Sequence, residues 1–218
     1  MRTVLFGSIG TLIDTSELQR RSFNDAFKEQ GLELHWDREY YQSLLKTSGG
    51  RDRVFDAIGD PDGGDVADEI YARKSEIFLD LLQTEKPPLR TIAQEVLDDA
   101  SQYDLQLGLV STTQRHVVDA IIKTGGLEGR FEVVTSGMDA AHPKPNRAIY
   151  DYALDVIGLN PDQAIAIEDN VAGAQSARAA GLTCLGLANA NTKEHPIPAD
   201  DDASKWRSYV YEAEKLSA

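Results

Sequence analysis

Residues 3–11 read Thr-Val-Leu-Phe-Gly-Ser-Ile-Gly-Thr, an apolar run that leads directly into a segment with two glycines. A short run of β-branched and aromatic residues is typical of a buried strand, and clustered glycine and serine end such a strand in a tight turn. The pattern predicts a strand over residues 3–6 and a glycine-rich turn over residues 7–11.

Further short apolar runs alternate with helical patterns along the rest of the chain. Amphipathic helical periodicity fills the intervals between them, and Gly181 closes the last of these helices as a C-cap. Regular alternation of strand and helix predicts a parallel, doubly wound sheet with helices on both faces. The predicted strands after the first cover residues 105–110, 131–134, 164–167 and 185–187, and the predicted helices cover residues 114–123, 147–156 and 171–180.

Residues 16–86 interrupt this alternation. They contain helical patterns only, over residues 18–30, 40–45 and 66–82, and Pro87-Pro88 ends the segment. The sequence therefore predicts an α/β protein with a Rossmann-like core formed by residues 1–15 and 87–218. An all-helical cap domain over residues 16–86 is inserted after the first strand, on the side where open α/β sheets bind ligands.

Composition narrows the class of function. The 218 residues carry a formal net charge of −14, and 41% are hydrophobic, as in an ordinary globular protein. Nucleic acids and anionic membranes are bound through clustered Lys and Arg, so we expect neither as a partner. No apolar run approaches the ~18 residues of a membrane span, and no signal peptide precedes the first strand, so we expect a cytoplasmic protein. The single cysteine, Cys184, lies in an apolar stretch and is expected to be a buried core residue.

Polar clusters stand where three of the predicted strands end. These are residues 7–11, Ser111-Thr112 and Glu168-Asp169, while His142-Pro143-Lys144-Pro145 precedes a helix. Taken singly, each has a structural explanation, because Ser111 or Glu168-Asp169 would cap a helix and Lys144 would be a surface charge. Since parallel strands bring their carboxyl ends to one edge, the clusters together predict a ligand site there.

These motifs resemble the haloacid dehalogenase superfamily, in the branch with a helical cap after the first strand. Residues 3–6 and 10–15 are similar to its first motif, Ser111 to the second, Lys144-Pro145 to the third, and residues 167–173 with 179–181 to the fourth. Residues 44–53 are similar to the cap substrate loop of the xylulose-bisphosphate phosphatase group, a neighbour of β-phosphoglucomutase.

The resemblance implies a phosphate-binding role for four residues. The Ser111 hydroxyl and the Thr112 amide would donate to phosphate oxygens, and Lys144 would neutralise their charge. Thr11 and the turn amides would add a small anion nest. In the cap loop, Arg51 and Arg53 would either clamp a second phosphate or sugar, or be solvated charges at a helix end, and these alternatives stay open.

The resemblance also implies a Mg²⁺ site, though a weakened one. Asp169 would be the direct carboxylate ligand, Glu168 a second-shell or water-mediated partner, and the main-chain carbonyl of Ile9 a further ligand. The family has a third carboxylate at the position of Gly7, which this chain lacks. Because Mg²⁺ relies on one or two carboxylates with waters and substrate phosphate, we expect its binding to be weaker here.

The departure from the family is confined to the catalytic carboxylates. The resemblance places the nucleophile at Gly7 and the acid/base at Ile9, and neither residue can fill those roles. Ser8 lies between them but lacks an obvious histidine base. Asp14 is better explained as the cap of the following helix, with Glu17 completing a capping box.

We therefore expect a phosphatase-like protein of sugar-phosphate lineage that is hydrolytically impaired and retains binding of a small phosphorylated metabolite or inorganic phosphate. One alternative is a weak Mg²⁺-dependent phosphohydrolase acting on a small phosphorylated metabolite. The other is a regulatory or interaction protein whose pocket is vestigial.

Overall fold

A computed structural model describes residues 3–45, 49–59, 62–193 and 196–215. The chain divides into two compact units, one formed by Met1–Asp14 with Pro88–Ala218 and the other by Thr15–Pro87. Residues 46–48 of the expected cap loop lie outside the described residues.

The first unit is built on a six-stranded sheet in the order β3-β2-β1-β4-β5-β6, in which every neighbouring pair is parallel. The predicted Rossmann-like α/β class is confirmed. The third strand begins two residues later than predicted, and Phe131, which precedes it, packs edge-on against the Phe6 ring. The strands are β1 (Thr3–Phe6), β2 (Gln106–Val110), β3 (Val133–Thr135), β4 (Ala164–Glu168), β5 (Thr183–Gly186) and β6 (Asp201–Asp202).

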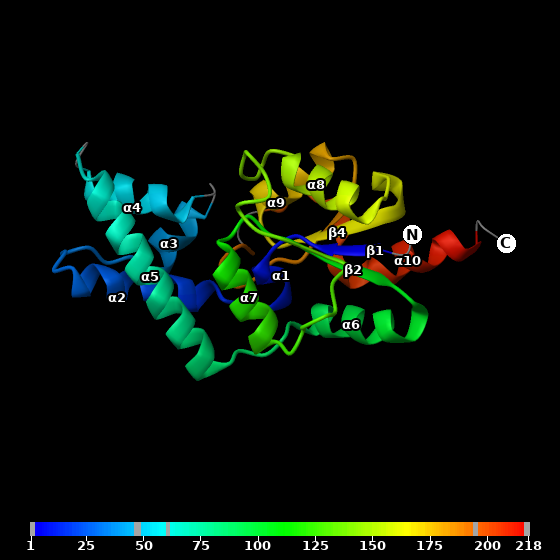
Figure 1. Ribbon diagram of the computed structural model, residues 1–218, viewed down its shortest axis with the longest axis horizontal. Coiled ribbons are helices and arrows are strands. Elements are labelled where there is room, and N and C mark those ends of the chain that lie inside the picture. The colour runs from blue at the N-terminus through cyan, green and yellow to red at the C-terminus, as the bar shows by residue number, and fades with distance from the viewer. Residues whose placement is uncertain (1–2, 46–48, 60–61, 194–195, 216–218) are drawn as a thin grey trace. The chain divides into compact units, whose positions relative to one another are not determined.

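Helices cover both faces of this sheet, with α8 (Ala148–Ile157) and α9 (Val171–Ala179) on one face and α6 (Thr91–Tyr103) on the other (Figure 1). The side of α9 that packs against the sheet carries alanines, whose small side chains let the helix lie close to β4. Tyr150 of α8 is fully buried in the same core cluster. The remaining helices of the unit are α1 (Ile9–Leu12), α7 (Arg115–Thr124) and α10 (Trp206–Lys215), with 3-10 turns at Pro161–Gln163 and Ala203–Lys205.

Strand register determines what meets at the carboxyl edge. Phe6, the last residue of β1, pairs with Leu109 of β2 and with Ile167 of β4. The residues that follow these three, namely Gly7, Val110 and Glu168, therefore stand side by side. The sheet thus brings together three of the polar clusters found in the sequence.

The second unit contains only helices among its described residues, which confirms the predicted helical insertion. Its core is aromatic, with Phe23, Phe27 and Trp36 buried against one another at centroid separations of 4.7–6.3 Å. The helices are α2 (Ser16–Glu29), α3 (Arg38–Leu44), α4 (Gly50–Ile58) and α5 (Gly64–Glu85).

The expected capping box at the start of this unit is wrong. Thr15, not Asp14, occupies the N-cap position of α2, and no side chain caps the helix. Glu17 instead forms an ion pair with Arg20 one turn later, at 2.5 Å. That pairing uses the carboxylate that a capping box would have turned back to the helix start. Throughout the described residues, the helices are too short or too polar to span a bilayer.

Candidate functional site

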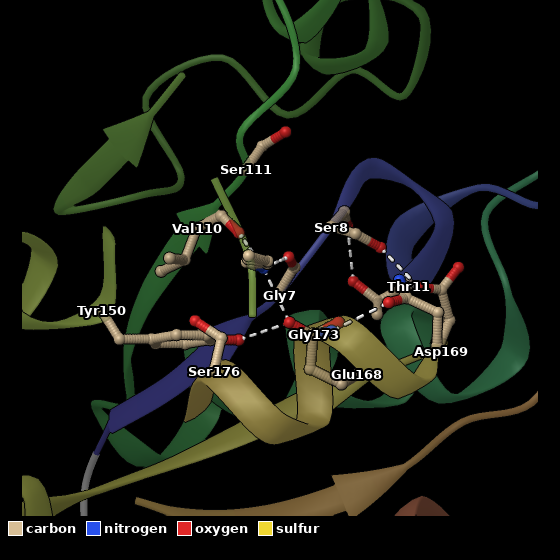
Figure 2. A network of polar contacts seen from close by, with 12 residues as sticks. Gly7, Ser8, Thr11, Val110, Ser111, Tyr150, Glu168, Asp169, Gly173 and Ser176 are labelled. Atoms are coloured by element: carbon tan, nitrogen blue, oxygen red, sulfur yellow. Dashed lines mark hydrogen bonds and ion pairs between the residues drawn. The ribbon is translucent and has the colours of Figure 1, made fainter. Parts of the chain in front are cut away.

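Glu168, at the end of β4, is the centre of a buried polar network at the carboxyl edge. Its side chain is fully buried, and its Oε1 accepts hydrogen bonds from Lys144 Nζ at 2.7 Å and from the Tyr150 hydroxyl at 2.8 Å (Figure 2). The other oxygen, Oε2, is buried without a hydrogen-bond partner among the described residues. The carboxylate therefore points into the protein, toward α8.

Lys144 is held entirely by this network. Its ammonium donates to the carbonyl oxygens of Gly7 and of Val110, the latter at 2.9 Å, as well as to Glu168. It also lies 4.8 Å from the centre of the Tyr150 ring. An ammonium has three hydrogens, so three acceptors satisfy it. The Lys144 ammonium, which was expected to neutralise a phosphate, is therefore hydrogen-bonded to three groups of the protein itself.

Two glycines make room for the Glu168 carboxylate. A Cβ atom added at Gly7 would lie closer than 3.0 Å to the Glu168 carboxylate and to the Tyr150 hydroxyl. A Cβ added at Gly173, on α9, would meet the same carboxylate just as closely. The space that a side chain at position 7 needs is therefore already filled.

Asp169, the next residue, is held by three side-chain donors. Its Oδ1 accepts hydrogen bonds from Ser8 Oγ at 2.9 Å and Asn170 Nδ2 at 2.8 Å, and its Oδ2 accepts from Asn189 Nδ2 at 3.1 Å. Its side chain is buried. Gly10 contributes by lacking a side chain, since a Cβ there would also lie within 3.0 Å of this carboxylate.

The segment predicted as an open glycine-rich turn is a single helical turn, α1. The Ile9 carbonyl, expected as a metal ligand, accepts the amide of Ile13 at 3.0 Å. Thr11 is fully buried, and both its hydroxyl and its amide donate to the Ser8 carbonyl, at 2.6 and 3.3 Å. Both donors of Thr11 that were expected to join a small anion nest are thus hydrogen-bonded to Ser8 within the turn itself.

The Ser111 hydroxyl donates no hydrogen bond among the described residues. Its Oγ accepts the amide of Thr113 at 3.0 Å, and its backbone exchanges two hydrogen bonds of 2.9 Å with the Thr135 hydroxyl on β3. Among the described residues, the Ser111 hydroxyl acts as an acceptor only. In Figure 2 it points away from the Glu168 network. Thr112 follows it and is partly exposed.

Burial and charge set the protonation of the network. Burial raises the pKa of Glu168, and the adjacent Lys144 ammonium opposes that shift. Burial also raises the pKa of Tyr150 far above its usual value, and the Glu168 charge acts in the same direction. The phenol therefore stays protonated and donates to Glu168. Cys184 is buried in the core as expected, and burial raises the pKa of its thiol.

A second cation, Arg90, lies close to Asp169. Its guanidinium donates to the carbonyl oxygens of Gly10, Leu187 and Ala188 at 3.1, 2.9 and 2.6 Å. Burial lowers the pKa of Arg90, and the charge of Asp169 counteracts this shift. The edge of the sheet therefore carries a positive charge on the Asp169 side as well.

The two cap arginines are bonded within their own unit. Arg51 pairs with Asp68 at 2.7 Å and donates to the Gly64 carbonyl at 3.1 Å. Arg53 donates to the Leu44 carbonyl at 2.9 Å, and burial lowers its pKa. A contact with ligand through either residue stays a prediction.

Three residues of the network escaped sequence reasoning. The sequence pattern places Tyr150 only in an amphipathic helix and offers no evident histidine base for Ser8. Asn189 belongs to a loop without a recognisable motif. Ser8 and Asn189 meet Asp169 across 161 and 20 residues of chain, respectively. Only Tyr150 has a sequence signal, because it lies near the start of the helix that follows the Lys144-Pro145 motif.

The chain matches the family model described as haloacid dehalogenase-like hydrolase over residues 4–187. It is 33% identical over 216 residues to protein CbbY of Rhodobacter capsulatus, covering 95% of this chain and 92% of that protein. A solved structure of a CbbY variant from Rhodobacter sphaeroides in complex with xylulose-(1,5)bisphosphate superposes with a TM-score of 0.84 at 30% identity, covering 92% of each chain. CbbY from the same organism in complex with phosphate gives 0.82 at 31% identity, with the same coverage. The chain therefore belongs to the haloacid dehalogenase-like hydrolase family, in the CbbY lineage.

Proposed function

We propose that this chain is a phosphatase-like protein that binds a small phosphorylated metabolite without hydrolysing it. One observation carries the proposal: the volume next to Gly7, where the family's nucleophile would stand, is filled by the Glu168 carboxylate and the Tyr150 hydroxyl. Position 7 therefore lacks a carboxylate, and the present packing leaves no space in which one would fit.

The chemistry of phosphate transfer lacks two of its groups. A covalent nucleophile is missing at Gly7, and Ile9 is an apolar, buried residue at the position of the acid/base. Ser8 is the nearest hydroxyl, but it donates its hydrogen to Asp169. Because that hydroxyl is one of the donors that hold Asp169 in place, Ser8 is a poor substitute for the missing nucleophile. Loss of a covalent nucleophile lowers turnover by roughly 10⁶ in serine proteases.

Groups that hold a phosphate are retained at the end of β2. The Ser111 hydroxyl hydrogen and the backbone amides after it stand at the carboxyl edge of the sheet, where open α/β folds bind ligands. CbbY of Rhodobacter sphaeroides has been solved with phosphate and, as a variant, with xylulose-(1,5)bisphosphate. A phosphorylated sugar is therefore the ligand class to test first. Lys144 would join only by exchanging Glu168 for a phosphate oxygen.

The proposal is tested by measuring turnover and binding on the same preparation. We expect no phosphate release from a panel of sugar phosphates that includes xylulose-1,5-bisphosphate, with CbbY as the positive control. We expect saturable binding of phosphate or a panel member by calorimetry, weakened at least about tenfold in Ser111→Ala by loss of a charge-assisted hydrogen bond. Ser176→Ala is the matched control, because this buried serine donates to the Asn146 carbonyl in the same unit.

Each other outcome points to a different function. Metal-dependent turnover near one per second that disappears in Asp169→Ala would contradict the proposal and favour a weak phosphohydrolase. Neither turnover nor binding would favour a regulatory protein with a vestigial pocket.

A further inference from the structure

The Mg²⁺ site that the family resemblance implies can be tested against the groups that would form it. Mg²⁺ requires near-octahedral oxygen coordination and is usually held by one or two carboxylates with waters and substrate oxygens. In this chain the candidates are Glu168, Asp169 and the Ile9 carbonyl, since Gly7 has no side chain. Each of these three groups accepts hydrogen bonds from the protein, and no two of them share a donor.

Glu168 is committed to Lys144. Its Oε1 accepts from the Lys144 ammonium at 2.7 Å and from the Tyr150 hydroxyl at 2.8 Å, and its Oε2 is packed against Gly173. If Glu168 turned toward a metal ion, the buried Lys144 charge would keep only two carbonyl oxygens. An uncompensated buried charge is strongly unfavourable, so the ion pair holds Glu168 away from a metal.

Asp169 is committed to neutral donors. Ser8, Asn170 and Asn189 donate to its two oxygens, and the carboxylate lies against Gly10 with its side chain buried. These three donors occupy three of the roughly four lone-pair sites of the carboxylate, so a cation would find only one of them unused, on Oδ2 beside Gly10. The Ile9 carbonyl accepts the Ile13 amide inside α1. The described residues contain no cluster of three or more His, Cys, Asp or Glu able to hold a metal ion.

The charges of the site are also balanced by the protein. Lys144 is bonded directly to Glu168, and the Arg90 guanidinium lies close enough to Asp169 for their charges to affect the pKa of Arg90. In an active member of the family a divalent cation would neutralise these carboxylates together with that of the nucleophile. Here Glu168 has a directly bonded protein cation, so part of the charge that a divalent cation would neutralise is already neutralised by Lys144.

We infer that protein donors have replaced the divalent cation in this site, with Ser8 and Asn189 holding Asp169 and Lys144 holding Glu168. The site therefore forms without Mg²⁺ and does not bind it at physiological concentration. This inference concerns the metal alone and stands independently of whether a phosphorylated ligand binds.

Metal binding is measured directly on the whole chain. Mn²⁺ serves as a paramagnetic probe, and its solution electron-paramagnetic-resonance signal is expected to stay unchanged when wild-type protein is added. Thermal unfolding in about 10 mM Mg²⁺ should match that in NaCl of equal ionic strength, because only a ligand of the folded state raises its stability. Loss of the Mn²⁺ signal, or an Mg²⁺-specific rise in Tm that is absent in Asp169→Asn, would overturn the inference.

A second experiment tests the donors themselves and needs no metal. The double variant Ser8→Ala/Asn189→Ala removes two of the three donors to Asp169. In the presence of EDTA we expect its urea midpoint to fall below that of wild type, because a buried carboxylate loses hydrogen bonds. The control is Ser43→Ala, whose hydroxyl donates to the Tyr40 carbonyl at the surface of the second unit. A double variant as stable as this control would show that the donors do not hold Asp169.

Discussion

Gly7→Ala is the most direct test of the packing around Glu168. The substitution adds a single carbon, which would lie closer than 3.0 Å to the Glu168 carboxylate and the Tyr150 hydroxyl, whereas ordinary contact begins near 3.4 Å. Both groups are fully buried and hydrogen-bonded to each other at 2.8 Å. One of them must therefore move, and the ion pair with Lys144 moves with it.

The size of the effect follows from three contributions. Overpacking a filled site costs about 1–3 kcal/mol, and complete loss of a partner in a buried ion pair costs about 3–5 kcal/mol. Replacing glycine by alanine stabilises the folded state by about 0.4–1 kcal/mol through the unfolded chain. Gly7 does not have a positive φ, so backbone strain adds nothing. With the ion pair weakened but not lost, we expect the free energy of unfolding to fall by about 3 kcal/mol.

Urea denaturation followed by circular dichroism measures this change. Gly64→Ala is the matched control, because the nearest atom to its added Cβ is Arg51 Nη2 at an ordinary 3.6 Å. In a Glu168→Ala background, Gly7→Ala should cost at least about 1 kcal/mol less, since contacting residues couple by that amount. If Gly7→Ala unfolds within about 0.5 kcal/mol of wild type, the typical range of an uneventful surface change, the packing argument is refuted.

Three further predictions concern activity, hydrogen bonding and pH. The double variant Gly7→Asp/Ile9→Asp should be less stable than wild type, because its new Cβ at position 7 collides with Glu168. It should also release little phosphate from sugar phosphates, and a double variant that is both stable and fast would contradict this prediction. Tyr150→Phe leaves Glu168 with one donor fewer and should lower stability by about 1–3 kcal/mol in urea denaturation, and an unchanged midpoint would exclude that role. Lys74 is buried among the Phe23, Tyr71 and Phe78 rings, and burial lowers its pKa to about 7. Above that pH the unfolded chain therefore binds more protons at Lys74 than the folded protein does. The free energy of unfolding of wild type should rise relative to that of Lys74→Met from about pH 7 to 9, and equal slopes of the two free energies against pH would contradict the lowered pKa.

The fold could be predicted because its signals are local. Strand-helix alternation and the helical segment after β1 depend on periodicities that a few consecutive residues carry. The helices and strands without an expectation were α1, α4, α6, α10 and the short edge strand β6. In α1 the two glycines of residues 7–10 pointed to a turn, yet the Ile13 amide closes a helical hydrogen bond onto the Ile9 carbonyl.

The sequence places the four candidate site residues near one edge of the sheet, but it does not predict the hydrogen bonds among them. Ser111, Lys144, Glu168 and Asp169 stand near the carboxyl edge, as the order of the strands implies. Sequence alone cannot tell which group a charged side chain will pair with, because the pairing depends on space left by glycines that are far away in the sequence. Lys144 turns to Glu168 rather than outward, and the missing side chain at Gly7 leaves room for that carboxylate.

The placement of the Glu168 carboxylate between Gly7 and Gly173 makes the effect of any substitution at position 7 depend on position 168. While Glu168 fills that gap and pairs with Lys144, an aspartate placed at position 7 meets a steric barrier before it can contribute any chemistry. A carboxylate could be accommodated there only if Glu168 swung out first, so the two positions form one coupled unit whose combined change cannot be read from the single substitutions.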